Sequence, residues 1–313
     1  MRRMKRNFRK FCRRNGAGWG AFAAAVVLMG CLSTSLQAQE KGQKTFRTAA
    51  EAGDALFLAL QGSEADMLLV LGQDAKQIVS SGDEREDVRR RTTFLSKYLE
   101  MHRLVKEPNG TTTIYIGAEN WPLPIPLVEK SGAWFFDTDA AKDEILFRRI
   151  GHNEMCAIRV SQELVMAEEE YYSGHQHQYA RKIASDPGKQ NGLYWQASGG
   201  QKESPMGPLV AEASVADGAG SANGLGAPAP FHGYYFRIVA AKNAEFAFVA
   251  FPAEYRNSGV MTFMVGKDGV VYEKDLGAET AKLAKSVKEY SLDSTWLKAE
   301  ETQEASAEAA KTK

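Results

Sequence analysis

Residues 234–274 read YYFRIVAAKNAEFAFVAFPAEYRNSGVMTFMVGKDGVVYEK, four apolar runs separated by short polar segments. Runs rich in aromatic and β-branched residues that are bounded by turn residues predict strands. The expected strands cover residues 234–239, 246–251, 260–265 and 270–274. Connections this short favour an antiparallel meander, with Gly266 to Gly269 as its last turn. We expect a helix near residues 278–290 to flank this sheet.

The chain before this sheet is mostly helical in pattern. A capping box at Thr48 to Glu51 predicts the start of a helix. Further helices are expected at residues 64–71, 87–101 and 139–151, and from Asn153 onward. A strand at 112–116 and an edge hairpin of 125–128 with 133–136 lie between them, whereas the prolines of 121–126 exclude a central strand. The sequence therefore predicts an α+β fold, with a helical N-terminal lobe, a small β-hairpin region and a C-terminal antiparallel sheet with a flanking helix.

Composition shifts indicate how the chain is organised. The expected segments are a signal peptide (1–38), a helix-rich α+β lobe (39–184), a loop-rich connector (185–232), a β-meander with its helix (233–298) and a disordered tail (299–313). Within the connector, residues 218–230 are almost wholly Gly, Ala, Ser, Asn and Pro, which predicts a flexible segment.

Residues 1–38 have the layout of a secretory signal peptide. Eight basic side chains and no acid precede an apolar run from residue 17 to 32, and small residues follow up to Ala38. The run is shorter than the ~20 residues of a spanning helix. Cleavage after Ala38 would release a soluble protein, a lipobox-like match at residues 28–31 would lipidate Cys31, and an uncleaved anchor is a third alternative. We expect an exported, periplasmic protein that meets the membrane only through its signal or a lipid anchor.

Charge and cysteine content narrow the classes of partner. The chain has 39 basic and 39 acidic residues, and without residues 1–38 it has 31 against 39, a net charge of −8. An acidic body argues against nucleic acid as a partner. Cys156 is the one thiol beyond residue 38, so no disulfide is expected within the body, and a place in a helix predicts an inert core thiol. No Gly-rich phosphate loop is present, and we expect no cofactor.

A set of short motifs runs through the chain. They are SGD (81–83), WPLPIP (121–126), WFFD (134–137), RRIGHNE (148–154), GLYW (192–195), SPMGP (204–208), HGYYF (232–236), GVMTF (259–263) and DGVVYEKDLG (268–277). In combination they resemble a bacterial family of exported proteins, domain of unknown function 2950, over roughly residues 46–296. The resemblance implies an envelope location and no particular activity. His152 stands where the family usually has Arg or Lys. The C-terminal sheet alone also resembles the head sheet of pilin-like proteins.

One candidate metal site lies near residue 170. His175 and His177 follow Glu168 in an acidic run, and imidazole and carboxylate groups suit zinc or a similar ion. Two histidines at this spacing converge from a strand or loop but not from a helix face. A solvated helix end followed by a polar turn explains the same residues.

The candidate binding residues are charged, amide or aromatic side chains near the predicted helix break and on loops. They are Trp121, Arg148, Arg149, Asn153, Glu154, Tyr194, Trp195, His232 and Tyr234. The two arginines could hold a carboxylate or phosphate, or form an interlobe ion-pair cluster with Glu154, which we favour. The aromatic residues could line a groove for glycan or peptide, or fix loops onto the core.

These observations favour an exported envelope protein that binds a protein, peptide or glycan partner or assists assembly without catalysis. The alternative is a metal- or acid-dependent hydrolase that acts on envelope material through His175, His177 and a nearby glutamate.

Overall fold

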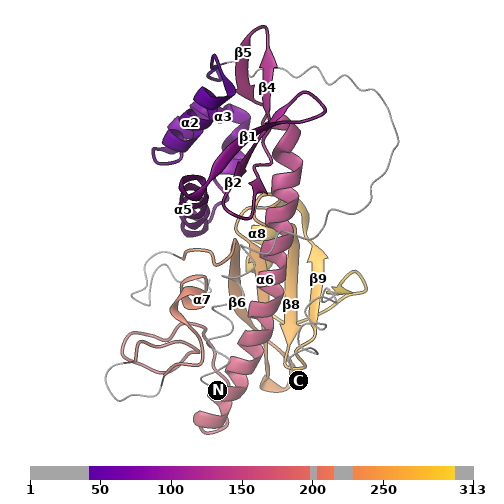
Figure 1. The fold of residues 1–313 in the computed structure, drawn as a ribbon. Coiled ribbons are helices and arrows are strands. Elements are labelled where there is room, and N and C mark those ends of the chain that lie inside the picture. Colours follow the sequence, from indigo (N-terminus) through magenta and orange to yellow (C-terminus); the bar gives the residue numbers. More distant parts are fainter. Residues whose placement is uncertain (1–41, 198–202, 215–227, 300–313) are drawn as a thin grey trace, which may run out of the picture. The chain divides into compact units, whose positions relative to one another are not determined.

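The computed structural model describes residues 42–197, 203–214 and 228–299 (Figure 1). The chain divides into two units, Met1–Ala38 and Gln39–Lys313, and every described residue belongs to the second. The predicted signal peptide with Cys31, residues 218–227 of the predicted flexible segment and residues 300–313 of the predicted tail lie outside the described residues.

The N-terminal helices begin where the sequence offers caps. They are α2 (Ala49–Ala59), α3 (Glu64–Leu71), the 3-10 turn η1 (Gln73–Ala75), α4 (Lys76–Val79) and α5 (Glu84–Glu100). The Thr48 side chain accepts from the Glu51 amide, and Ser63 forms a full capping box with Asp66. Helix α5 starts three residues before the predicted position because Asp83 accepts a hydrogen bond from the Glu86 amide.

The first sheet follows these helices and is antiparallel. Its strands are β1 (His102–Lys106), β2 (Thr112–Ile116), β3 (Trp121–Pro122), β4 (Leu127–Lys130) and β5 (Ala133–Phe136), in the order β1-β2-β4-β5 with β3 on β2. The hairpin β4–β5 and the confinement of the proline-rich segment to a two-residue strand confirm the prediction. Strand β1 was missed because it is largely exposed and lacks apolar alternation. Leu56, Ile114 and Phe136 belong to the apolar core between this sheet and the helices.

Helix α6 (Asp139–Gly174) is continuous over 36 residues, so the predicted break between Gly151 and Asn153 is wrong. Gly151 is exposed with open space around its Cα, and a helix tolerates such a glycine at a cost of about 1 kcal/mol. Asn153 lies inside the helix with its side chain committed elsewhere, so it caps nothing. Asp139 is the first helical residue and Thr138 the cap position. Arg148 and Arg149 therefore lie mid-helix, away from its C-terminal end.

The second sheet is the predicted antiparallel meander with one extra strand. Its strands are β6 (Tyr234–Ala240), β7 (Phe246–Pro252), β8 (Met261–Gly266), β9 (Val271–Asp275) and β10 (Leu297–Lys298), in the order β10-β9-β8-β7-β6. The 3-10 turn η3 (Gly277–Glu279) and α8 (Thr280–Ser286) follow β9. Helix α8 is shorter than predicted because the chain next turns extended and Tyr290 donates to the Ala240 carbonyl at the edge of the sheet.

Helices contact both faces of the second sheet. Every residue of β7 is buried, and successive side chains point to opposite faces. Helix α6 contacts β7, β8 and β9 (Figure 1). Helix α8 contacts β7, and its Ala284 shares a core cluster with Val249 and Phe251. Helix α6 also contacts η1 and α4, so one helix connects the N-terminal elements with the C-terminal sheet.

The connector is irregular in its described part, with the short helix α7 (Pro208–Glu212) and isolated bridges from Ala184 to Tyr194 and from Ser214 to Phe236. Among the described helices, none combines the length and the apolarity that crossing a bilayer requires.

Candidate functional site

Polar side chains gather where the middle of α6 meets the start of α5 and the loops that flank β6, β7 and β8. We call this group the polar junction. Its members are Asp83, Glu86, Arg90, Arg149, Asn153, Glu154, Asn257 and Ser258. Three of them, Arg149, Asn153 and Glu154, are candidate binding residues from the sequence.

Arg149 donates from both terminal nitrogens to its own chain, whereas its buried Nε has no partner among the described residues. Only 5% of its surface is exposed. Its Nη1 donates to the Gln77 carbonyl and to Asn257 Oδ1, both at 2.6 Å, and its Nη2 donates to the Ile78 carbonyl at 2.5 Å. Burial, with a smaller effect of the Arg90 charge, lowers the pKa of Arg149 to about 10, still well above neutrality. This guanidinium is therefore a buried cation that ties α4 and the β7–β8 loop to α6.

Asn153 and Asp83 hold the two loops that approach α6. Asn153 Nδ2 donates to the Ser258 carbonyl at 2.8 Å, and the Gly233 amide donates to Asp83 Oδ2 at 2.9 Å. Gly233 has φ +73°, and a Cβ there would lie 2.6 Å from Asn153 Nδ2. Only glycine suits such a position. Close packing against Asn153 and the positive φ therefore explain why the HGYYF motif has a glycine at position 233.

Glu154 also binds backbone. Its Oε1 accepts from the amides of Val260 and Met261 at 2.9 and 3.0 Å. The fully buried Tyr234 donates from its hydroxyl to the Met261 carbonyl at 2.9 Å. Both contacts fix the first residues of β8 against α6 and β6.

An ion-pair group on α5 completes the junction. Glu86 accepts from Arg89 Nε at 2.7 Å and from Arg90 Nε at 2.9 Å. Burial raises the pKa of Glu86, but the hydrogen bond from Arg89 and the charges of Arg90 and Arg89 outweigh it and bring the pKa to about 2. Arg90 Nη2 reaches Asn153 Oδ1 at 3.4 Å, so α5 is joined to α6.

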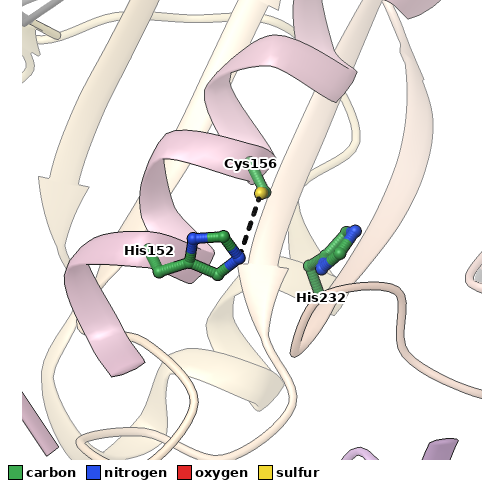
Figure 2. A group of neighbouring side chains, drawn as sticks. All are labelled: His152, Cys156 and His232. Atoms are coloured by element: carbon green, nitrogen blue, oxygen red, sulfur yellow. Dashed lines mark hydrogen bonds between the residues drawn. The ribbon is translucent and has the colours of Figure 1, made fainter. Parts of the chain in front are cut away.

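His152, Cys156 and His232 lie beside the polar junction and form a cluster of metal-ligating types (Figure 2). Cys156 Sγ is 3.8 Å from His152 Nε2, one helical turn away on α6, and the His152 and His232 rings meet edge to face at 5.9 Å. Each residue can offer one ligand atom such that all three atoms lie within 4.8 Å of one another. In the described ranges 42–197, 203–214 and 228–299, no other group of three meets this criterion.

Burial and the neighbouring charges keep His152 of this cluster neutral. Burial lowers the pKa of His152 to about 4, and the charges of His232 and Arg90 act in the same direction. His152 is therefore an uncharged imidazole at neutral pH. The hydrogen bond to Glu86 raises the pKa of Arg89, so this guanidinium also stays charged.

The candidate binding residues Trp121, Arg148, Tyr194 and Trp195 lie outside the polar junction and the cluster beside it. Trp121 packs against the N-terminal core, and Arg148 pairs with Glu144 along the outer side of α6. Trp195 is 6% exposed and meets His175 at 5.8 Å, near the C-terminal end of α6. Tyr194 exchanges backbone hydrogen bonds with Ile183 and Ser185. The aromatic residues are thus distributed over three regions, and Tyr234 is wholly buried.

Glu168, His175 and His177 all lie around the C-terminal end of α6. Glu168 has no exposed surface; its Oε2 accepts from the Ala180 amide at 2.9 Å, and burial raises its pKa to about 8. The His175 ring stacks on Tyr171 at 3.8 Å with Nδ1 3.0 Å from the Tyr171 carbonyl, while His177 packs edge to face on Tyr172. Each of the two rings is thus oriented by a different tyrosine.

The comparisons with known proteins assign the family. A family model described as "Protein of unknown function (DUF2950)" matches residues 43–299, which include both sheets and α6. The chain belongs to the DUF2950 family. Neither a curated protein nor a solved structure matches it significantly, so the pilin-like resemblance of the second sheet stays a prediction.

Sequence reasoning missed the partners that complete the junction in this DUF2950 chain. Asn257 and Ser258 lie in the turn between β7 and β8 and carry no local signal beyond turn composition. The pairing of Cys156 with His152 had a signal, because residues four apart share a helix face. The predicted helix break beside His152 concealed that signal.

Proposed function

We propose that this DUF2950 chain is an exported envelope protein that binds a partner or assists assembly and catalyses no reaction. The export part is supported by residues 1–38, whose basic, apolar and small segments follow the order of a signal peptide. The partner remains a protein, peptide or glycan of the envelope, and the acidic body disfavours nucleic acid.

The binding part of the proposal is supported by what the junction residues hold. Arg149, Asn153 and Glu154 are the charged and amide side chains of the polar junction that a substrate could bind, and each donates to or accepts from the protein's own backbone. A substrate would have to displace these buried contacts, and each unsatisfied buried group costs about 1–3 kcal/mol. This commitment of the polar side chains is the observation that carries the proposal, because it gives them a structural role in place of a catalytic one.

Export is tested by intact-mass measurement of tag-free protein recovered from the native host, alongside a Cys31→Ala variant. A mature N-terminus at Gln39, unchanged in the variant, is the expected result for cleavage after Ala38. A lipidated N-terminus at Cys31 that the variant abolishes would also support export. A folded chain in the cytosol that retains Met1 would contradict it.

A second assay tests the alternative that the protein is a hydrolase. Tag-free protein and its His177→Ala variant are incubated with solubilised envelope material, with and without a chelator. We expect no release of products above background in any sample, because Glu168 has no exposed surface and cannot reach a substrate. Product release that both the chelator and the variant abolish would replace the binding proposal with the hydrolase.

A further inference from the structure

We propose that His152, Cys156 and His232 form a binding site for a zinc-type divalent metal ion. The described chain brings together two of its five histidines with Cys156, the one cysteine beyond residue 38. Two of the three ligands come from α6 and the third from the loop that precedes β6 (Figure 2). The site goes beyond the proposed binding role and does not depend on it.

The separations suit tetrahedral coordination. Zinc binds thiolate sulfur at about 2.3 Å and imidazole nitrogen at about 2.0–2.1 Å, which sets the sulfur and nitrogen about 3.6 Å apart. Cys156 Sγ and His152 Nε2 are already 3.8 Å apart. The other pairs lie within 4.8 Å, so side-chain rotation of His232 has to close a gap of at most about 1.5 Å.

The backbone holds the ligands in place before a metal arrives. His152 and Cys156 are four residues apart on one face of a long helix. His232 has φ +50° and precedes Gly233, whose amide is bound to Asp83 and whose carbonyl accepts from the Ala253 amide. The other neighbour, Phe231, exchanges backbone hydrogen bonds with Tyr234, so the fixed loop limits where the His232 ring can go. Such rigid support is what a metal site requires.

One ring nitrogen of His232 lacks a hydrogen-bond partner within the described ranges. Its Nδ1 is buried and has no hydrogen-bond partner in the described structure. A buried polar atom without a partner carries a free-energy cost of about 1–3 kcal/mol. A metal ion bound at that nitrogen, or at Nε2 with Nδ1 donating to a newly ordered water, would remove this cost.

The donor set selects the class of ion. One thiolate and two neutral imidazoles are ligands that zinc prefers, whereas magnesium and calcium take oxygen ligands. Binding converts the Cys156 thiol to a thiolate and releases its proton to solvent. The carboxylates of Asp83 and Glu86 offset the charges of Arg89 and Arg90 around the cluster.

Three protein ligands leave one coordination position of a tetrahedral ion open. His152 and His232 are half-buried, so that position can take a water molecule or a donor atom of a binding partner. The cluster therefore has the form of an exchangeable site and not of a closed structural one.

The test is a titration of reduced, tag-free protein with Co²⁺, which reports on ligands by its spectrum, and then with Zn²⁺ in competition. We expect one Co²⁺ per chain, a thiolate-to-metal charge-transfer band in the near ultraviolet, and full displacement by Zn²⁺. Cys156→Ser should abolish the band. His152→Ala and His232→Ala should each weaken binding by more than about 100-fold, beyond the 10–100-fold cost of losing a residue that only orients a ligand.

His177→Ala is the matched control, because His177 is an exposed histidine at the end of the same helix. It should bind Co²⁺ like the unaltered protein. Circular dichroism of each metal-free variant shows whether it is folded, and Cys156→Ser changes too little volume to unfold the helix. Absence of the band in folded protein, or a band in His232→Ala that forms with the Co²⁺ affinity of the unaltered protein, would overturn the proposal.

Discussion

Replacing Arg149 by methionine is expected to lower the free energy of unfolding by about 3 kcal/mol, because it leaves the carbonyls of Gln77 and Ile78 and the Asn257 side-chain oxygen without this donor. Methionine matches the length of the side chain and avoids a large cavity. It also removes the cost of burying a cation, which limits the loss. Urea unfolding followed by circular dichroism measures the change.

Arg148→Met is the matched control for this prediction. Arg148 is the next residue on α6, but its side chain is 39% exposed and pairs with Glu144 one turn away. Exposed pairs of this kind contribute about 0.3–0.5 kcal/mol. Equal effects of the two substitutions would show that Arg149 is not the buried tie that the structure describes.

The second large effect concerns pH. Glu168→Gln is expected to remove a loss of stability that the unaltered protein suffers between about pH 4.5 and pH 8. Burial raises the pKa of Glu168 in the folded state to about 8, from its ordinary value of 4.5. As the pH rises through 4.5 the unfolded state releases this proton while the folded state keeps it. The unfolded state then binds fewer protons, so the free energy of unfolding falls until about pH 8.

The size of this effect follows from the shift in pKa. Each pKa unit corresponds to 1.36 kcal/mol, so the unaltered protein should lose about 3 kcal/mol more than Glu168→Gln between pH 5 and pH 8. Arg181 and Glu169 are the other charged groups that act on Glu168, and both remain in the variant. Glu169→Gln, at the exposed neighbouring position, should leave the pH dependence nearly unchanged. Parallel pH profiles for the unaltered protein and Glu168→Gln would contradict the buried, protonated carboxyl.

Most of the fold was predictable from the sequence because its elements carry strong local signals. The runs between Tyr234 and Lys274 became β6 to β9, and caps at Thr48, Ser63 and Asp83 begin three helices. The error at Gly151 has a physical cause. Glycine and Asn153 are both helix-weakening residues, yet the apolar contacts of α6 with β7, β8 and β9 outweigh their low propensity.

The candidate site was much less predictable than the fold. The sequence favoured an ion-pair role for Arg149 and Glu154, but their observed contacts are to backbone groups and to Asn257, distant in the chain. His232 lies near Cys156 because β6 starts beside α6. The two residues are far apart in the sequence, so no local pattern predicts this proximity. Tertiary placement therefore decides both the polar junction and the cluster beside it.

The central claim is that the polar side chains of α6 bind the protein itself and not a substrate. A double-mutant cycle between Arg149 and Asn257, with Arg149→Met, Asn257→Leu and the double variant, tests it most directly. If the 2.6 Å contact exists in solution, the free energies of unfolding should show a coupling of about 1 kcal/mol or more. Additive effects, within about 0.3–0.5 kcal/mol, would mean that the two side chains do not meet and would contradict the account.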